Sequence, residues 1–254
     1  MKPEIGNIKA NLNKIASFFK QAKNQNPDFI IFPELCLQGI TTPDVIDATA
    51  EPIPGPVSNT LCELSKTYGV YAIVGMAEKN GSKLFNSAVF SSPEGKIIGV
   101  YHKVHLWITE SQYITRGSSY PVYETEFGKV AIWICYDTRF PEVARLYALK
   151  GAKIAFEPTA WLGRDVNHWK LLTRVRALDN FMYVCGTDEV VQSEYYQSVG
   201  CSMIVDPCGE IIVSAEPMIE TMITAELELQ QVDYMRNLIP VLRDRQKNTY
   251  TDLF

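Results

Sequence analysis

The most constraining feature of this sequence is an apolar run that ends in a cysteine. Val130 to Ile134 are all apolar, Cys135 follows directly, and a charged turn containing Pro141 comes next. A strand packed on both faces has such a continuous apolar run, and ligands in α/β folds collect at the carboxyl ends of such strands. We therefore expect a buried sheet with a thiol where a ligand binds.

Composition favours a globular protein built around one large core. The chain has 254 residues, of which 46% are hydrophobic and 21% charged. No apolar run approaches the length of a membrane span, and the N-terminus lacks the apolar centre of a signal peptide, so we expect a cytoplasmic protein. The net charge of −5, without a dense Lys/Arg cluster, argues against nucleic acid and favours a small-molecule partner.

The cysteines do not have the spacing of a metal site or a disulfide framework. No C-x-x-C pair occurs among them. Most are expected to be small apolar core residues, and only its place after a strand distinguishes Cys135. The six cysteines are Cys36, Cys62, Cys135, Cys185, Cys201 and Cys208.

Hydrophobic periodicity predicts alternating helices and strands in a single domain, residues 1–254. An amphipathic helix is expected over residues 8–23, with hairpin turns at 92–96 and 206–209, so the sheet should be mixed. Further helices are predicted over residues 59–68, 142–149 and 169–180, and strands over 28–34, 71–76, 86–90, 97–101, 154–158 and 182–186.

The segment after Gln230 is polar and carries a thin apolar stripe of Tyr234, Leu238 and Leu242. Such a terminal segment packs on a neighbouring subunit more often than on its own core. A homodimer or a higher homo-oligomer is therefore expected.

Three predicted strand ends offer a carboxylate, an ammonium and a thiol: Glu34, Lys103 and Cys135. Each has a structural alternative, because a carboxylate can cap a turn, a lysine is usually solvated, and a thiol is often a core residue. Taken together with their neighbours in the sequence, the three favour a catalytic site.

Those neighbouring residues resemble the signature blocks of the nitrilase superfamily of carbon–nitrogen hydrolases. The blocks are residues 32–34, 101–107 and 135–142, in the superfamily's order. The likeness continues through residues 176–180 and 200–209 and covers nearly the whole chain. Members usually open with an apolar strand that is missing here before residues 3–12, and we expect upstream coding sequence to add it.

The resemblance implies an α/β fold, a four-layer α-β-β-α sandwich with two mixed sheets. It implies that Glu34 is a general base, Lys103 stabilises an oxyanion, Cys135 is the nucleophile and Glu110 is a second carboxylate that orients substrate or acid. It requires no metal or organic cofactor. The expected reaction cleaves the C–N bond of a small amide through a thioester and releases ammonia and a carboxylic acid.

Elementary chemistry supports these roles. A thiol with an ordinary pKa of about 8.5 is mostly protonated at neutral pH, so it needs a nearby base such as Glu34. The Lys103 ammonium, beside the backbone N–H of Tyr136, would then face the negative oxygen that develops on the attacked carbonyl. A catalytic histidine is disfavoured, because His102 and His105 flank Lys103 on opposite faces of an extended segment.

The substrate is expected to be an amide rather than a nitrile. True nitrilases tend to have Trp-Glu after the cysteine, whereas the Tyr-Asp found here resembles amidases that act on small amides, including ω-amide acids. Tyr136, Trp161 and His168 are expected to line the pocket. Arg139 can bind a substrate carboxylate, although a structural role is the preferred interpretation, as a local ion pair with Glu142 or another acid of the turn.

Three other functions remain open from the sequence. An N-carbamoyl amide hydrolase would use the same residues and also release carbon dioxide. A catalytically silent member would serve in binding or assembly. A thiol acyltransferase would pass the thioester to an amine rather than to water.

Overall fold

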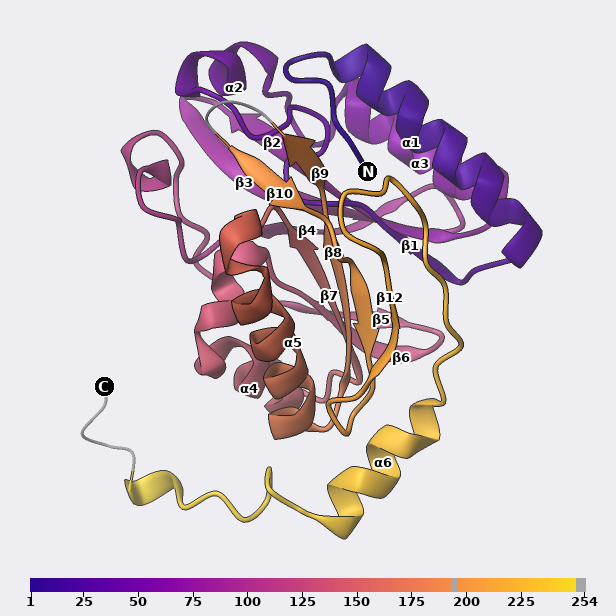
Figure 1. Ribbon diagram of the computed structural model, residues 1–254, viewed down its shortest axis with the longest axis vertical. Helices are drawn as coiled ribbons and strands as arrows, with labels where there is room; N and C mark the ends of the chain where they lie inside the picture. Colours follow the sequence, from indigo (N-terminus) through magenta and orange to yellow (C-terminus); the bar gives the residue numbers. More distant parts are fainter. Residues whose placement is uncertain (193–195, 250–254) are drawn as a thin grey trace.

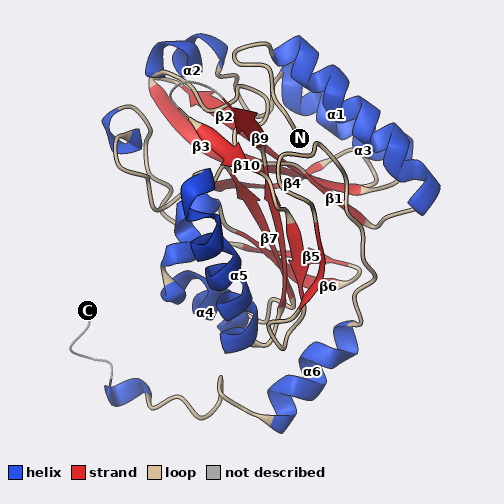
Figure 2. Ribbon diagram, in the orientation of Figure 1, coloured by secondary structure: helices blue, strands red, loops and turns tan. Residues whose placement is uncertain are grey.

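Two β-sheets lie face to face between two helical layers in the computed structural model, which describes residues 1–192 and 196–249 (Figures 1 and 2). Helices α1 (Ile8–Ala22) and α3 (Pro56–Tyr68) cover the first sheet. Helices α4 (Pro141–Leu149) and α5 (Val166–Asn180) cover the second. The expected four-layer α-β-β-α sandwich is confirmed.

The first sheet has the strand order β1-β2-β3-β4. Strands β1 and β2 are parallel, whereas β2–β3 and β3–β4 are antiparallel, so β1, β2 and β4 all run in one direction. Their carboxyl ends therefore lie at one edge of the sheet. The bounds are β1 Phe29–Ile31, β2 Tyr71–Asn80, β3 Lys83–Ser91 and β4 Ile97–His102.

The second sheet has the order β12-β11-β8-β7-β6-β5. Its centre, β6-β7-β8, is parallel, and the outer pairs are antiparallel. Both sheets are therefore mixed, as expected. The bounds are β5 Val122–Thr125, β6 Gly128–Ile132, β7 Ile154–Thr159, β8 Tyr183–Asp188, β11 Met203–Val205 and β12 Ile211–Ser214.

Smaller elements complete the described part of the chain. A separate hairpin, β9 (Val190–Gln192) with β10 (Gln197–Val199), follows β8, and α6 (Leu229–Leu238) lies beside the sandwich near the C-terminus (Figure 1). The remaining elements are α2 Pro43–Thr49 and the 3-10 helices η1 Lys23–Gln25, η2 Glu110–Gln112, η3 Cys135–Arg139, η4 Gly163–Asp165 and η5 Lys247–Thr249.

Most predicted elements occur, with different ends. The strand predicted over residues 28–34 is only β1, because the chain turns away from β2 at Pro33. The run from Val130 to Ile134 begins inside β6, and its last two residues lie beyond the strand. Helix α2 and strand β5 were not predicted; α2 buries only Ile46, which is too weak a pattern for periodicity to detect.

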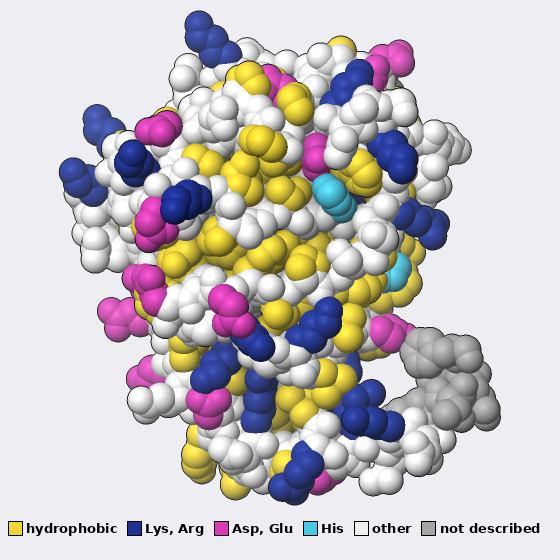
Figure 3. All heavy atoms as spheres, turned by 180° about the vertical axis from the view of Figure 1, so that it is seen from behind, with side chains coloured by type: hydrophobic (Ala, Val, Ile, Leu, Met, Phe, Trp, Pro, Cys, Tyr) yellow, Lys and Arg dark blue, Asp and Glu magenta, His cyan; other side chains and the backbone are white. Residues whose placement is uncertain are grey.

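The main apolar core fills the space between the sheets, where Tyr101 and Phe156 lie, and continues under helix α4, where the Trp133 ring stacks on that of Tyr147. On the face opposite to that of Figure 1, hydrophobic side chains form a band across the middle, surrounded by interspersed positive and negative side chains (Figure 3). Within the described ranges, no helix is both long and apolar enough to span a membrane.

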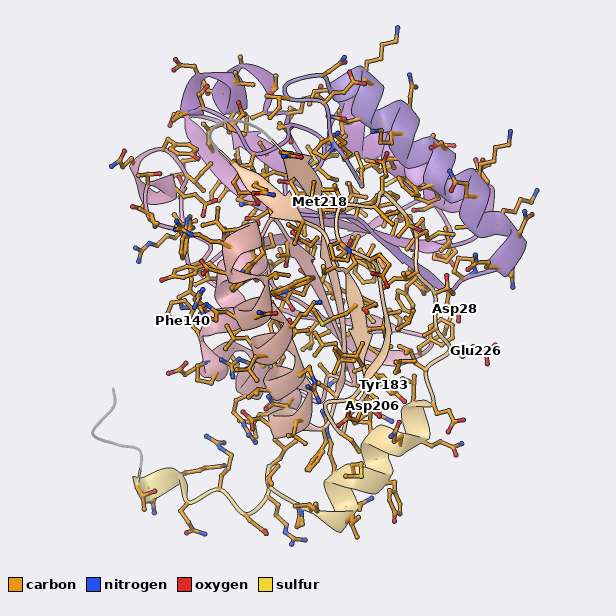
Figure 4. All side chains as sticks on the ribbon, in the orientation of Figure 1. Asp28, Phe140, Tyr183, Asp206, Met218 and Glu226 are labelled. Atoms are coloured by element: carbon orange, nitrogen blue, oxygen red, sulfur yellow. The ribbon has the colours of Figure 1, made fainter. Side chains whose placement is uncertain are left out.

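An apolar cavity of about 450 Å³ borders the edge of β1 that faces away from β2. Its walls include Met1, Phe156, Cys185 and Met203, together with residues 221–227. Asp28 and Glu226 at its rim lie on the opposite side of the molecule from Phe140, which follows the Cys135 turn (Figure 4). The side chains of Glu34, Lys103, Glu110 and Cys135 are not among the residues that line it.

Candidate active site

The shared strand directions bring the three sequence candidates together. Glu34 follows β1, Lys103 follows β4 and Cys135 follows β6. All three side chains are buried, with exposed fractions of 2%, 2% and 8%. Polar groups are rarely buried without partners, so their contacts show what the site is built for.

Lys103 joins two carboxylates. Its Nζ lies 2.7 Å from Oε1 of Glu34 and 2.7 Å from Oε2 of Glu110, which also accepts from the N–H of Trp107 at 2.6 Å. Burial alone would lower the pKa of Lys103, but the charges of Glu34 and Glu110 outweigh it and raise that pKa well above its ordinary value. Lys103 is therefore a fixed ammonium inside the protein.

Glu34 is held by donors on both oxygens. Besides Lys103, Oε1 accepts from Nδ2 of Asn86 at 2.7 Å, and Oε2 accepts from the N–H of Ala160 at 3.0 Å. Burial raises the pKa of Glu34, and the contribution of Lys103 opposes this only in part. A carboxylate with a raised pKa is a better proton acceptor than an exposed one.

The thiol of Cys135 contacts the residue that also binds Glu34. Its Sγ lies 3.8 Å from the carbonyl oxygen of Ala160. Burial and the charge of Glu34 raise the pKa of the Cys135 thiol well above its ordinary value, although Lys103 opposes the effect. The resting thiol is therefore protonated and needs a base. Ala160 contacts both groups, the thiol through its carbonyl oxygen and Glu34 through its N–H.

Two of the turns that present these groups have unusual backbone conformations. Cys135, the first residue of η3, has a φ of 46°, and Leu35, directly after Glu34, has a φ of 45°. Side chains other than glycine rarely adopt this region, and such strain concentrates at functional sites. The fold therefore supplies stabilisation elsewhere to hold both turns.

Asp137 provides part of that stabilisation for the nucleophile turn. Its Oδ2 accepts from the backbone N–H of Ile134 at 3.0 Å and from the hydroxyl of Tyr101 at 2.7 Å. Its Oδ1 accepts from the backbone N–H of His105 at 2.9 Å. Asp137 thus ties the segment that carries Cys135 to the segment that carries Lys103.

Glu157, within β7, also stabilises the turn that carries Cys135. Its Oε1 accepts from Thr138 at 2.6 Å and Trp169 at 2.9 Å, and its Oε2 accepts from Thr173 at 3.1 Å. Burial raises the pKa of Glu157 to about 7, despite these donors. Arg176 completes the support by donating to the Thr138 carbonyl at 2.9 Å.

The histidines have partners other than the thiol. His102 Nε2 lies 2.7 Å from Glu78, and His105 Nδ1 lies 2.8 Å from Asp137. The side chain of His168 is 63% exposed, and its nearest carboxylate is 3.6 Å away on the preceding turn. The structure therefore places His168 at the surface rather than in the wall of the site.

Arg139 and Trp161 stack on one another. The guanidinium carbon of Arg139 lies 4.8 Å from the centre of the Trp161 ring, which is a cation–π arrangement. Within residues 1–192 and 196–249 no carboxylate forms an ion pair with Arg139, so the expected ion pair with Glu142 is not formed. The ring of Tyr136 meets that of Trp107 edge-on at 4.8 Å.

Asn86 and Tyr196 are among the contributors that the sequence analysis did not identify. Asn86 lies within β3 and is fully buried. The available sequence signal was an amide side chain inside a predicted strand. Tyr196 comes from the β9–β10 hairpin; burial first, then Glu189, Asp188, Cys135 and Glu34 raise its pKa. No local pattern marks Tyr196, because only the hairpin's packing brings it near the thiol. In the described part of the chain, no cluster of three or more His, Cys, Asp or Glu side chains can hold a metal.

The family model for carbon-nitrogen hydrolases matches residues 1–237 of the chain. The chain belongs to the carbon–nitrogen hydrolase family. It is accordingly a hydrolase of carbon–nitrogen bonds other than peptide bonds. The omega-amidase among its relatives supports the amide C–N bond as the type of bond cleaved.

Similar proteins match all or nearly all of this carbon–nitrogen hydrolase. A probable nitrilase of Schizosaccharomyces pombe is 33% identical over 100% of the chain and 96% of its own length. An omega-amidase of Xenopus laevis is 34% identical over 95% of the chain and 91% of its own length. The crystal structure of a Helicobacter pylori carbon-nitrogen hydrolase matches with a TM-score of 0.91 at 26% identity, over 100% of this chain and 96% of that one.

A Saccharomyces cerevisiae protein of branch 10 of the nitrilase superfamily matches with a TM-score of 0.88 at 30% identity. The match covers 97% of this chain and 93% of that one. The nitrilase-like sandwich expected from the sequence is thereby confirmed.

Proposed function

We propose that this carbon–nitrogen hydrolase cleaves small ω-amide acids through a thioester on Cys135. The observation that carries the proposal is the shared contact at Ala160: its N–H binds Glu34 at 3.0 Å and its carbonyl lies 3.8 Å from the thiol. Nucleophile and base therefore meet at one residue, with the Lys103 ammonium 2.7 Å from the base. This is the arrangement that nucleophilic catalysis requires.

In the first half-reaction, Sγ of Cys135 attacks the amide carbon and its proton passes to Glu34. Negative charge develops on the carbonyl oxygen, where the Lys103 ammonium and the backbone N–H of Tyr136 stabilise it. The first N–H groups of a helix have no partner within the helix, so that of Tyr136 can serve as a donor. The C–N bond then breaks, Glu34 protonates the departing nitrogen, and ammonia leaves a thioester.

In the second half-reaction, water attacks the thioester carbon. Glu34 removes a proton from the water, the C–S bond breaks, and the proton returns to the Cys135 sulfur. The acid is released with the protein in its starting state, so a single carboxylate serves as base and as acid in both halves. Glu110 keeps the Lys103 ammonium in place through the 2.7 Å contact with its Nζ.

The proposed substrate class follows from Arg139. Its guanidinium lies on the face of Trp161, close in the chain to the nucleophile, and it lacks an ion-pair partner within the described ranges. A guanidinium matches a carboxylate with two parallel hydrogen bonds. A carboxylate at the far end of the substrate would supply that partner, and the omega-amidase name of the Xenopus relative supports the same class.

Ammonia release from a substrate panel tests the proposal. The panel contains ω-amide acids, neutral amides of the same length, N-carbamoyl amino acids and nitriles, each with the protein and its Cys135→Ala variant. Cys208→Ala is the matched control, because Cys208 is a half-buried thiol in the β11–β12 turn, where its sulfur contacts Gln231 of α6. We expect turnover of ω-amide acids that Cys135→Ala abolishes and Cys208→Ala preserves.

Trapping the intermediate separates the competing activities. Hydroxylamine should convert the thioester to a hydroxamate at the expense of the free acid. Release of carbon dioxide with ammonia from a carbamoyl compound would identify a carbamoyl amide hydrolase instead. Undiminished turnover in Cys135→Ala would refute the thiol mechanism.

We also propose a cytoplasmic homo-oligomer, most simply a homodimer that uses α6. Tyr234 and Leu238 on this helix are 64% and 59% exposed, whereas Leu242 packs against the protein's own core and leaves the predicted stripe. All six cysteines are free, which fits a reducing compartment. Sedimentation of the protein and its Tyr234→Asp variant tests the assembly, because a charge on the interface should shift the protein towards monomer.

A further inference from the structure

Asn86 contacts both carboxylates of the site through one amide nitrogen. Its Nδ2 donates to Oε1 of Glu34 at 2.7 Å and to Oε1 of Glu110 at 3.0 Å. The side chain is fully buried in β3, where the backbone carbonyl of Asn86 also accepts from the N–H of Lys103 at 2.9 Å. Asn86 therefore contacts the Glu34 and Glu110 carboxylates and the backbone of Lys103, three of the residues to which the mechanism assigns a role.

The amide orientation follows from its neighbours. The reverse orientation would place the Asn86 carbonyl oxygen against two carboxylates, which repel it, whereas the NH₂ group has two hydrogens to donate. An amide also keeps these donors at every pH, unlike a second lysine. Lys103 offers a single positive charge to two buried carboxylates. Asn86 donates a further hydrogen bond to each carboxylate without adding a charge.

The two oxygens of Glu34 are consequently different. Oε1 accepts from Lys103 Nζ at 2.7 Å and from Asn86 Nδ2 at 2.7 Å, whereas Oε2 accepts from the Ala160 N–H at 3.0 Å. The Cys135 thiol also forms a side-chain hydrogen bond with the Glu34 carboxylate. A carboxylate oxygen has about two acceptor sites, so Lys103 and Asn86 fill those of Oε1, and Oε2 keeps one site for the thiol. That site is on Oε2, which binds the N–H of Ala160, and the carbonyl of Ala160 contacts the thiol.

We propose that Asn86 is a positioning residue that directs the transferred proton to Oε2 of Glu34. This inference rests on the proposed thiol mechanism. The S–H bond of Cys135 breaks, the O–H bond forms at Oε2, and the same proton later passes to the departing nitrogen. Without Asn86, Oε1 regains a free acceptor site, and the proton can then also bind to the oxygen of Glu34 that does not contact Ala160.

Asn86 has a second effect through Glu110. Glu110 begins η2, in the connection between β4 and β5. Ile108, two residues earlier, is exposed and has a φ of 36°. The contacts that hold its carboxylate are those to Lys103, Trp107 and Asn86. Losing Asn86 therefore loosens Glu110 and, through it, the Lys103 ammonium.

Kinetics of Asn86→Leu test the inference, because leucine keeps the volume and removes both donors. We expect kcat and kcat/KM for the best amide to fall together by about 10- to 100-fold, the effect of one hydrogen bond to a charged group, with KM little changed. The acidic limb of the kcat/KM profile should also move to higher pH, because a hydrogen bond to the ionised carboxylate lowers the pKa of Glu34 and its loss raises it. Asn86→Asp should lose more activity, because a third carboxyl group then faces the other two.

Ser87→Ala is the matched control. Ser87 is the next residue of β3, is fully buried, and donates to Glu78 at 2.7 Å away from the thiol. It loses a comparable buried hydrogen bond, so its activity loss measures general damage to the strand. An equal loss in Ser87→Ala and Asn86→Leu, or an acidic limb that does not move in Asn86→Leu, would overturn the positioning role.

Alkylation of Cys135 by iodoacetamide provides a readout that needs no substrate. Mass spectrometry gives its rate against pH in the protein and in Asn86→Leu. A shift of the acidic limb to higher pH in the variant supports the inference, and superimposable profiles contradict it. Amide turnover that survives in Cys135→Ala would instead refute the proposed function, so the two failures are distinguishable.

Discussion

Gly75 lies against the backbone of Glu34 with no room for a side chain between them. A Cβ atom at Gly75 would lie 2.7 Å from the Cα of Glu34 and 2.3 Å from the carbonyl oxygen of Pro33. Gly75 is in the middle of β2, and the requirement is for space rather than for an unusual φ. The absence of a side chain at Gly75, on the neighbouring strand, therefore decides how closely the backbone of Glu34 packs against β2.

Gly75→Ala should displace Glu34 and reduce kcat/KM by about 100-fold, because a misplacement of about 1 Å at a reacting group costs that much. Steady-state kinetics and circular dichroism would show this as lost activity in a folded protein. Gly81→Ala is the control: nothing lies within 4 Å of its Cβ position, and its φ of 61° costs only about 1 kcal/mol of local strain. Ordinary kcat in Gly75→Ala would show that the turn can move without consequence.

Lys103→Met should lower the free energy of unfolding by about 3–5 kcal/mol, because removing one partner of a buried ion pair leaves uncompensated charge. Two carboxylates lose their shared ammonium in this variant. Denaturant unfolding near neutral pH measures the loss. Lys79→Met removes an exposed pair with Asp47 and should cost less than about 1 kcal/mol. A Lys103 variant as stable as the Lys79 variant would mean that the site is more hydrated than its burial indicates.

Glu157 should make the protein less stable as the pH rises. Burial raises its folded-state pKa from 4.5 to about 7, so its stabilising contribution is complete below pH 4.5 and is lost as the pH rises through 7. Across that window the loss is roughly 3 kcal/mol. Urea unfolding at several pH values should show a smaller fall in stability for Glu157→Gln than for the unaltered protein.

The exposed Glu124 provides the control for that comparison. Glu124→Gln should keep the full pH dependence of the unaltered protein. If Glu157→Gln keeps it as well, Glu157 is already ionised in the folded state and its three donors outweigh its burial.

Arg139→Met should change specificity rather than the chemical step. For ω-amide acids KM should rise about 10- to 100-fold, because a hydrogen-bonded contact with a charged group is lost. Neutral amides of the same length should be unaffected, since they offer no carboxylate. Initial-rate kinetics on matched pairs, with the surface variant Arg174→Met as control, measures this. Equal effects on both substrate types would assign Arg139 to the packing of Trp161 instead.

Residues whose position follows from strand direction were accessible to sequence reasoning. Cys135 directly follows a continuous apolar run, and Glu34 and Lys103 stand just beyond two other predicted strands. Because ligand groups in α/β folds collect at carboxyl ends, local patterns were enough to nominate all three. Strand ends were less accurate, since residues 32–34 leave the sheet where the sequence predicted strand.

Residues that depend on register or on distant packing were not accessible. Asn86 reaches Glu34 only because β3 lies between β2 and β4 in one particular register, and a shift of one residue would turn it to the other face. His168 and Arg139 show the converse. The sequence predicted His168 in the pocket and left Arg139 between a substrate carboxylate and a preferred local ion pair. In the structure, helix α5 turns the histidine to the surface and Trp161 stacks on the arginine.

By itself the sequence determined the layered α/β fold, the thiol at a strand end and its family, because apolar periodicity and short motifs are local properties. Tertiary structure alone decided that one ammonium serves Glu34 and Glu110, that Ala160 joins base and thiol, and that Asn86 saturates one oxygen of Glu34. Those relationships depend on where separate chain segments meet within hydrogen-bond distance. That geometry is set by sheet register and core packing, which no single segment encodes.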